Sequence, residues 1–278
     1  MREGDQRVNE QQITVNGQRI AFRESQGTEG PVIFVHGNSC SSRTWSGIMQ
    51  GPFGQRFRCL ALDLPGHGNS AKAGDPEDYS LPGYAQVLTG FAQAASASSA
   101  VIVGWSLGGH IALEAAPHLG TASGFVIFGT PPIATADQMS VAFQPNPAMA
   151  FTFAPSLSPD EARSYAEAFT APRSSLDLGE IVADVLRTDG AARAGLGASL
   201  AEGRYADEVA ITSAMTKPLA ILHGEAEQLI SLDYLRTLRI PALWRQEIQL
   251  IPGAGHSPHL ETPEAFARLL QDYLADLG

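Results

Sequence analysis

The sequence has few cysteines, few cationic side chains and no long apolar run. Its 278 residues include only two cysteines, Cys40 and Cys59, which excludes a disulfide framework and a thiolate metal site. Lys and Arg total 18 against 29 Asp and Glu, a net charge of −11, so the chain lacks the basic surface of a nucleic-acid-binding protein. No apolar run approaches the ~18 residues of a membrane helix. We therefore expect neither a nucleic-acid partner nor a membrane.

The start of the chain is polar. Residues 1–7 are mostly charged or polar, and no apolar segment of the kind found in secretory signals follows them. This pattern predicts a cytoplasmic protein, with a monomer or a small homo-oligomer as its expected state.

Short apolar runs recur along the first half of the sequence. They lie at 32–35, 59–62, 101–103 and 125–128, and each is followed closely by Gly or Asp. Continuous runs of this length are typical of strands buried on both faces. Helical stretches at 81–97 and 107–116 separate them, and an Asn-Gly turn at 16–17 predicts a hairpin before them. The alternation predicts an α/β protein with a mostly parallel, doubly wound sheet.

The pattern changes after residue 131. From 132 to 216 no buried strand is visible, and the segment carries several prolines and helical stretches near 159–169 and 176–186. A loop of this length would be exceptional. Strand signals resume at 219–222 and 248–251, and a last helix is expected at 263–277. We predict a helical cap, 132–216, inserted into a core formed by 1–131 and 217–278.

One short motif predicts a nucleophile. Residues 104–108 read Gly-Trp-Ser-Leu-Gly, which matches G-x-S-x-G with Ser106 at its centre. A predicted strand precedes the motif and a predicted helix follows it, as the motif requires, because the sharp turn lifts the serine above the carboxyl edge of the sheet. The glycines leave room for a strained serine backbone. The alternative is an ordinary glycine-rich turn.

A serine hydroxyl needs a base before it can attack at neutral pH. Among seven histidines, His256 is the preferred base because it follows the last predicted strand in a glycine-rich loop, at the edge where Ser106 also lies. His36 and His67 lie in glycine-rich turns and are expected to order those loops. His259 is the fallback and is expected at the surface.

The base needs a carboxylate that orients it and stabilises its charged form. Glu225, Glu227 and Asp233 all follow the predicted strand at 219–222. Glu227 is preferred, since Glu225 lies close to the strand end and Asp233 is expected within the next helix. A solvated loop carboxylate is the alternative reading of Glu227.

An oxyanion formed during attack needs hydrogen-bond donors. The backbone N–H of Leu107 should be one, because the first amides of a helix have no internal partner. The loop after the strand at 32–35 should supply the other, and the N–H of Asn38 fits. Its side chain is a further candidate to point into the site.

The order Ser106, Glu227, His256 is that of α/β-hydrolases, and the chain resembles an α/β-hydrolase-fold enzyme over nearly its whole length. Residues 63–70 resemble a turn common in that superfamily, where they shape the sheet edge. Four segments together resemble the α/β-hydrolase-type N-acyl homoserine lactonases, the quorum-quenching enzymes: 36–39, 104–111, 129–132 and 187–190. The resemblance implies a serine hydrolase that opens a lactone ring and uses Glu as the acid, and Glu227 falls at the matching place.

The resemblance also implies a cap tyrosine that contacts the substrate carbonyl, and Tyr165 is the matching candidate. Its alternative role is that of a half-buried cap residue. Phe143, Met149 and Phe151 in the cap, with Trp105 beside the nucleophile, are further candidates to contact the substrate. More often, such residues form the core of the cap itself.

Metal-dependent lactone opening needs clustered histidines with an aspartate. The sequence has no His-x-His and no His-Glu-x-x-His, so we expect no metal and no cofactor. The expected partner is a small acylated lactone or ester.

Three other functions stay open. A general carboxylesterase or cofactor-free perhydrolase would use the same triad. A carbon–carbon bond hydrolase usually has a small polar residue where this chain has Trp105. A ligand receptor on a hydrolase fold would bind without appreciable turnover.

Overall fold

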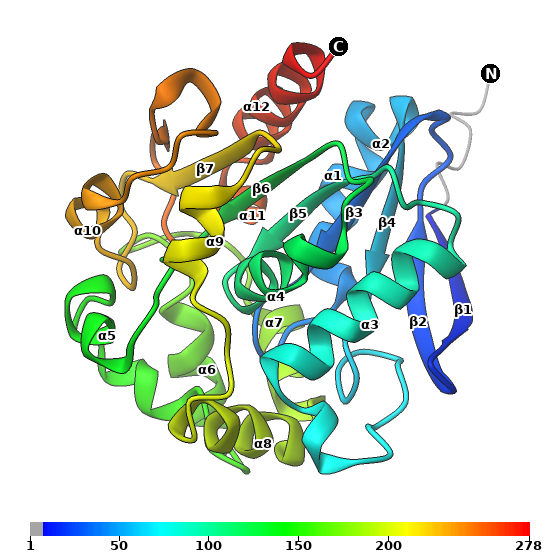
Figure 1. The fold of residues 1–278 in the computed structure, drawn as a ribbon. Coiled ribbons are helices and arrows are strands. Elements are labelled where there is room, and N and C mark those ends of the chain that lie inside the picture. The colour runs from blue at the N-terminus through cyan, green and yellow to red at the C-terminus, as the bar shows by residue number, and fades with distance from the viewer. Residues whose placement is uncertain (1–7) are drawn as a thin grey trace.

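The computed structural model describes residues 8–278, so residues 1–7, on which the expectation about a secretory signal rests, lie outside it. Eight strands form one sheet in the order β1-β2-β4-β3-β5-β6-β7-β8. Only β2 runs against the others (Figure 1). The strands are β1 (Asn9–Val15), β2 (Gln18–Glu24), β3 (Glu29–Val35), β4 (Phe57–Leu62), β5 (Val101–Trp105), β6 (Gly124–Phe128), β7 (Leu219–Gly224) and β8 (Gln249–Ile251).

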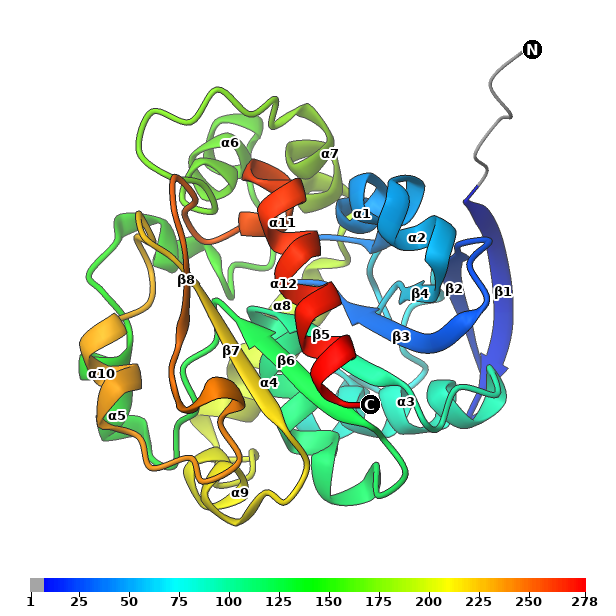
Figure 2. The same ribbon diagram turned by 90° about the horizontal axis from the view of Figure 1, so that it is seen from above.

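Helices cover both faces of this sheet. Figure 2 shows α1, α2, α11 and α12 on one face and α3, α4 and α9 on the other. The helices are α1 (Ser46–Gln50), α2 (Pro52–Arg56), α3 (Leu81–Ala94), α4 (Leu107–Ala115), α5 (Ala136–Ala142), α6 (Pro159–Glu167), α7 (Gly179–Arg187), α8 (Gly190–Ala201), α9 (Glu208–Ala214), α10 (Leu232–Thr237), α11 (Pro258–Glu261) and α12 (Pro263–Asp276). Within residues 8–278, no helix combines the length and apolar character needed to cross a membrane.

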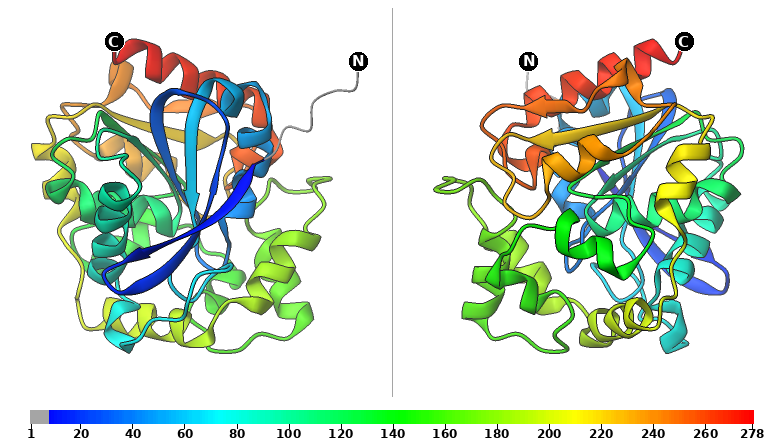
Figure 3. Two further views of the ribbon diagram at one scale, coloured as in Figure 1. Left: turned by 90° about the vertical axis from the view of Figure 1, so that its right-hand side faces the viewer. Right: turned by 60° about the vertical axis from the view of Figure 1, so that its left-hand side comes forward.

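The central strands owe their position to apolar side chains on both faces. Every residue of β5, β6 and β7 is buried, as expected for strands covered by helices on either side. The edge is different: β1 is mostly exposed, and the Asn16-Gly17 turn joins it to β2 as the outer hairpin (Figure 3). The predicted doubly wound α/β sheet is confirmed.

The helices α5 to α9 come between β6 and β7 in the chain. Helices α6, α7 and α8 gather beyond the carboxyl ends of the central strands (Figure 1). This is the inserted helical cap. Helix α8 was not foreseen, since its sequence is rich in Gly and Ala and carries little apolar patterning. The domain bounds 132–216 for the cap and 1–131 with 217–278 for the core stay a prediction.

Buried polar contacts join the cap to the loop after β3. Asp184 of α7 accepts a hydrogen bond from Ser41 Oγ at 2.5 Å and pairs with the Arg43 guanidinium. Arg193 of α8 is buried and donates through Nη1 to Ser39 Oγ at 3.3 Å. Two cap helices therefore hold the segment that leads from β3 into the site.

Candidate active site

Ser106 lies between β5 and α4 at a sharp turn. Its backbone has φ 53° and ψ −118°, a conformation that costs energy for a residue with a side chain. Neighbouring backbone and side chains hold it there. Its N–H donates to the Phe128 carbonyl at 2.9 Å, and its carbonyl accepts from Thr130 Oγ1 at 2.8 Å. The surroundings fix the strained turn and present the hydroxyl at the carboxyl edge of the sheet.

The glycines of the motif are required by close approach. A Cβ at Gly104 would lie 2.3 Å from the Gly108 carbonyl oxygen, and a Cβ at Gly108 would lie 2.2 Å from the Val35 carbonyl oxygen. Neither position has room for a methyl group. Helix α4 can thus pack directly against β3 and β5 beneath Ser106.

His256 and Glu227 form a buried pair. His256 Nδ1 lies 2.8 Å from Glu227 Oε2, and Glu227 Oε1 accepts the Leu229 N–H at 2.7 Å. Burial raises the pKa of Glu227, but His256, the Leu229 N–H and His223 together outweigh it, so the pKa of this carboxyl group is lowered. Because a carboxylate only accepts, Nδ1 carries the proton. His256 Nε2 has no hydrogen-bond partner among residues 8–278, and His256 lines the same cavity as Ser106.

The two other candidate acids lie elsewhere. Glu225 is exposed, and the Asp233 side chain is 95% exposed in the first turn of α10. Of the three candidates, Glu227 is the one that contacts His256.

Trp105 corrects one expectation. It is fully buried and does not line the cavity that contains Ser106. Trp105 is the last residue of β5, and its side chain points away from the cavity. Its Nε1 donates to the His256 carbonyl at 2.8 Å. Trp105 therefore supports the loop of His256 and lies outside the cavity lining.

His259 was expected at the surface, and this is also wrong. Its ring is buried between Trp45, at 4.4 Å between ring centroids, and Trp105, at 4.7 Å. Burial, with a smaller contribution from His256, lowers the pKa of His259 well below its usual value. It packs as an uncharged ring under the active-site loop.

The two residues expected to supply oxyanion donors both border the cavity that contains Ser106. Leu107 is the first residue of α4, and Asn38 lies in the loop after β3; both line the cavity. Neither N–H has a hydrogen-bond acceptor in the described part of the chain. The Asn38 side chain is already engaged, since its Nδ2 donates to the Thr152 carbonyl at 2.8 Å.

The cavity over Ser106 has a volume of about 460 Å³ and a largely apolar lining. Three of the candidates for substrate contact, Tyr165, Phe143 and Met149, line it. Phe151 does not; its ring packs edge-on against Tyr165 inside the cap, at 6.4 Å between centroids. Burial raises the pKa of the Tyr165 hydroxyl, which keeps it protonated and able to donate.

The fold and the site have known counterparts. Residues 32–269 match the model of the alpha/beta hydrolase family. The chain belongs to this family. A structure of a mutant N-acyl homoserine lactonase, AidH, with N-hexanoyl homoserine is 32% identical and covers 98% of both chains, with a TM-score of 0.92. A structure of another AidH mutant holds N-hexanoyl homoserine lactone, also with a TM-score of 0.92.

Curated relatives of this α/β-hydrolase include esterases. The pimeloyl-[acyl-carrier protein] methyl ester esterase of Nitrosomonas europaea is 26% identical, with 87% of this chain and 95% of that protein covered. An uncharacterised protein of Mycobacterium tuberculosis is 38% identical over 101 residues, and the match spans 28% of its length. Esterases are therefore among the relatives of this member of the alpha/beta hydrolase family.

The turn at 63–70 has the structural role expected of it. Asp63 accepts the backbone N–H groups of Ser42 and Asn69, each at 2.7 Å. His36 Nε2 accepts the Leu64 N–H at 3.0 Å. These groups order the sheet edge next to the loop after β3.

One pair on the cavity was missed by sequence reasoning. His110 lines the cavity one turn after Ser106 on α4, and its Nδ1 lies 2.8 Å from Glu208 Oε1 at the start of α9. The spacing of four residues was the available signal, since it lets the His110 N–H bond to the Ser106 carbonyl one turn into α4. The Glu208 partner comes from a distant segment.

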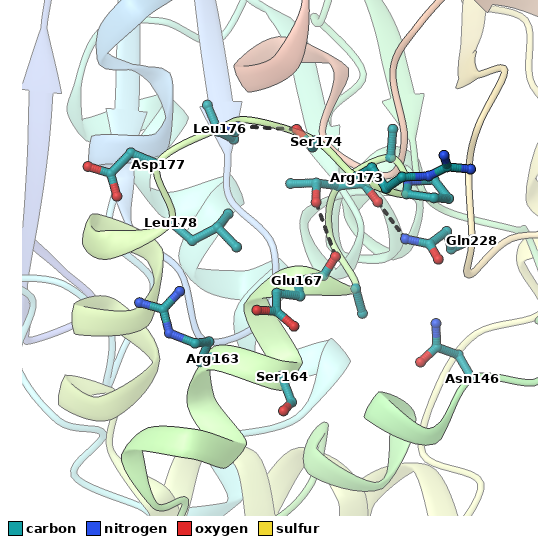
Figure 4. Close-up of a pocket in the computed structure, with 14 residues that line it drawn as sticks. Asn146, Arg163, Ser164, Glu167, Arg173, Ser174, Leu176, Asp177, Leu178 and Gln228 are labelled. Carbon is teal, nitrogen blue, oxygen red and sulfur yellow. Dashed lines mark hydrogen bonds between the residues drawn. The ribbon is translucent and has the colours of Figure 1, made fainter.

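A second cavity of about 580 Å³ is lined by α6, the loop that follows it and Gln228 (Figure 4). Arg163 extends from α6, and Arg173 lies on the following loop. Gln228 Nε2 donates to the Thr170 carbonyl at 2.6 Å and closes one wall. Across the described residues, no three His, Cys, Asp or Glu side chains are arranged to hold a metal ion.

Proposed function

We propose that the chain is a serine hydrolase that opens the lactone ring of N-acyl homoserine lactones, with Ser106 as nucleophile, His256 as base and Glu227 as its acid. The observation that carries the proposal is the buried His256–Glu227 pair. His256 Nε2 has no partner among the described residues, and His256 lines the same cavity as Ser106. The similarity to a lactonase over 98% of both chains supports the lactone as substrate.

The chemistry follows from these positions. His256 Nε2 takes the Ser106 proton as the hydroxyl oxygen attacks the ring carbonyl. The amides of Leu107 and Asn38 stabilise the oxyanion, and the loss of one such donor typically costs about 10²–10³ in rate. The ring C–O bond breaks, His256 returns the proton to the departing alkoxide, and water then cleaves the acyl-enzyme. Glu227 stabilises the imidazolium throughout.

The cavity suits an acylated substrate. Its volume of about 460 Å³ lies within the usual range for small-molecule sites, roughly 300–1,000 Å³. Phe143 and Met149 offer apolar contacts for an acyl chain, and Tyr165 offers a hydroxyl donor for a carbonyl.

A lactone poses one difficulty that a simple ester does not. The departing alcohol remains attached to the acyl-enzyme, and return to the ring can have an effective molarity of about 10⁵ M or more. We expect the cap to hold the opened chain extended, so that the hydroxyl leaves the carbonyl. Rapid-quench mass spectrometry should then show a mass increase on Ser106; normal turnover without that adduct would favour direct attack by water.

The first test is mass spectrometry of the purified protein with N-hexanoyl homoserine lactone. We expect a product heavier by one water, formed by the wild type and absent with Ser106→Ala. Ser213→Ala, a change at an exposed serine of α9, is the matched control and should retain full activity. Free fatty acid with homoserine lactone would instead show amide cleavage.

A general carboxylesterase is the second candidate. The methyl ester esterase relative of Nitrosomonas europaea, similar over 87% of this chain, favours it. A series of aryl esters compared with lactones by kcat/KM distinguishes the two. Faster turnover of simple esters, with no ring opening, would replace the lactonase by an esterase that uses the same triad.

A further inference from the structure

A second histidine–carboxylate pair opens onto the active-site cavity. His110 lies on α4, where its N–H donates to the Ser106 carbonyl at 3.3 Å, one helical turn from the nucleophile. Its Nδ1 lies 2.8 and 3.0 Å from the two oxygens of Glu208. The His110 side chain is 15% exposed and lines the cavity, whereas the Glu208 side chain is 1% exposed.

Glu208 is fixed by its own contacts. Its Oε2 accepts the Ile133 N–H at 3.0 Å, and its N–H donates to the Ile133 carbonyl at 3.0 Å. A carboxylate held in this way only accepts, so His110 Nδ1 carries a proton whether the ring is neutral or charged. Nε2 is then the one ring nitrogen left for the cavity. It accepts a hydrogen bond when the ring is neutral and donates one when the ring is charged.

Three other polar side chains that line the cavity already have partners, whereas the Thr152 hydroxyl has none among the described residues. The Asn38 amide donates to the Thr152 carbonyl, Gln144 Nε2 donates to the Ile230 carbonyl at 2.9 Å, and Asn146 Oδ1 accepts the Ala148 N–H at 2.9 Å. His110 differs from them because its partner occupies only one of its two ring nitrogens. It is the polar group of α4 that remains free to contact a ligand beside Ser106.

We infer that His110 Nε2 binds the amide that joins the acyl chain to the lactone ring, and that Glu208 positions it. The inference rests on the proposed function. A secondary amide buried in an apolar cavity loses its hydrogen bonds to water and needs a replacement. It offers both an N–H and a carbonyl oxygen, so it complements Nε2 in either charge state. His110 thereby selects acylamino lactones over lactones that lack the amide.

The test compares two substrates in one variant. His110→Asn places an amide nitrogen near the position of Nδ1, so it keeps a donor for Glu208 but has no counterpart of Nε2. We measure kcat/KM on N-hexanoyl homoserine lactone and on an alkyl γ-lactone of similar length without the amide. The first should fall about tenfold or more, and the second should stay within about twofold. His118→Asn, at an exposed histidine outside the site, is the matched control.

Each other result is informative. Equal losses on both lactones, or no loss on either, would overturn the contact and leave His110 as a link between α4 and α9. A loss confined to 3-oxo-acyl substrates would overturn the amide assignment in favour of the 3-oxo group. If His110→Asn lowers the unfolding midpoint, His110→Gln, which places its amide nitrogen near Nε2, should restore discrimination between the two lactones. Wild-type enzyme that opens only the amide-free lactone would overturn the proposed substrate as well.

Discussion

The carboxylate of Glu227 is the side chain whose charge the proposed chemistry depends on most. It is buried with His256, and both of its oxygens are occupied, one by the His256 ring and one by the Leu229 N–H. No step of the reaction touches Glu227 itself. Its contribution is to fix which nitrogen of His256 faces the serine and to stabilise the charge that develops on that ring.

Glu227→Gln therefore should lower kcat by about 10²–10⁴ with little change in KM, since size is kept and charge is lost. Steady-state kinetics on an aryl ester and on a lactone measure it. Glu225→Gln, two positions earlier and exposed, is the control and should behave as wild type. More than a tenth of wild-type kcat in Glu227→Gln would remove Glu227 from the triad.

Single side chains were predictable where local spacing determines them. The G-x-S-x-G motif located Ser106 at a strand-to-helix turn, because that turn leaves room only for glycine at Gly104 and Gly108. Trp105 was misjudged because proximity in sequence to Ser106 was read as proximity to the cavity, although Trp105 ends β5 and is buried outside the cavity lining. The pairing of His110 with Glu208 depends on tertiary structure, which no local pattern encodes.

Between elements, the contact of the cap with the loop after β3 matters most. The Asp184 carboxylate of α7 accepts hydrogen bonds from Ser41 Oγ and from the guanidinium groups of Arg43 and Arg187. Ser41 lies three residues after Asn38, whose N–H is the proposed oxyanion donor. The position of that donor is therefore coupled to α7.

Asp184→Asn should reduce the free energy of unfolding by about 1–3 kcal/mol, because it removes the charge that three donors share; the half-exposed Arg187 limits the loss. We also expect kcat/KM to fall two- to tenfold as the loop loosens. Urea unfolding and ester kinetics test both effects. Glu180→Gln, on the same helix and exposed, is the control. Unchanged kinetics in a destabilised Asp184→Asn would show that cap and donor are independent.

The elements themselves were predictable to different extents. Buried strands were recognised because helices cover both faces and leave continuous apolar runs, as in β5 and β6. The hairpin followed from Asn-Gly. Helix α8 was missed, since alanine and glycine give no clear apolar face and its formation relies on packing around buried Arg193.

Buried uncharged histidines set the acid stability of the molecule. Burial lowers the pKa of His36 to about 4 and that of His67 to about 3, from an ordinary value of 6.5. Below pH 6.5 these two histidines bind protons in the unfolded chain but stay unprotonated in the folded chain. The free energy of unfolding therefore falls as the pH drops from about 6.5 towards 4, and each such histidine contributes a slope of about 1.4 kcal/mol per pH unit.

Urea unfolding at several pH values tests this dependence. His67→Asn, which cannot take up a proton, should reduce the slope between pH 4.5 and 6 by about 1.4 kcal/mol per pH unit. Between pH 7 and 8 the two proteins should show parallel curves, since the histidine is then neutral in both states. Equal slopes at acid pH would mean that His67 is protonated in the folded protein.

The insertion of the cap between β6 and β7 affects how the protein folds during its synthesis. Phe125 of β6 pairs with Leu219 of β7, so this part of the sheet closes only after the whole cap has been synthesised. Ser106 emerges early, whereas Glu227 and His256 emerge after the cap. A chain that stops before β7 carries the proposed nucleophile without the proposed base and presents the unpaired edge of β6. The proposed reaction therefore needs residues made both before and after the cap.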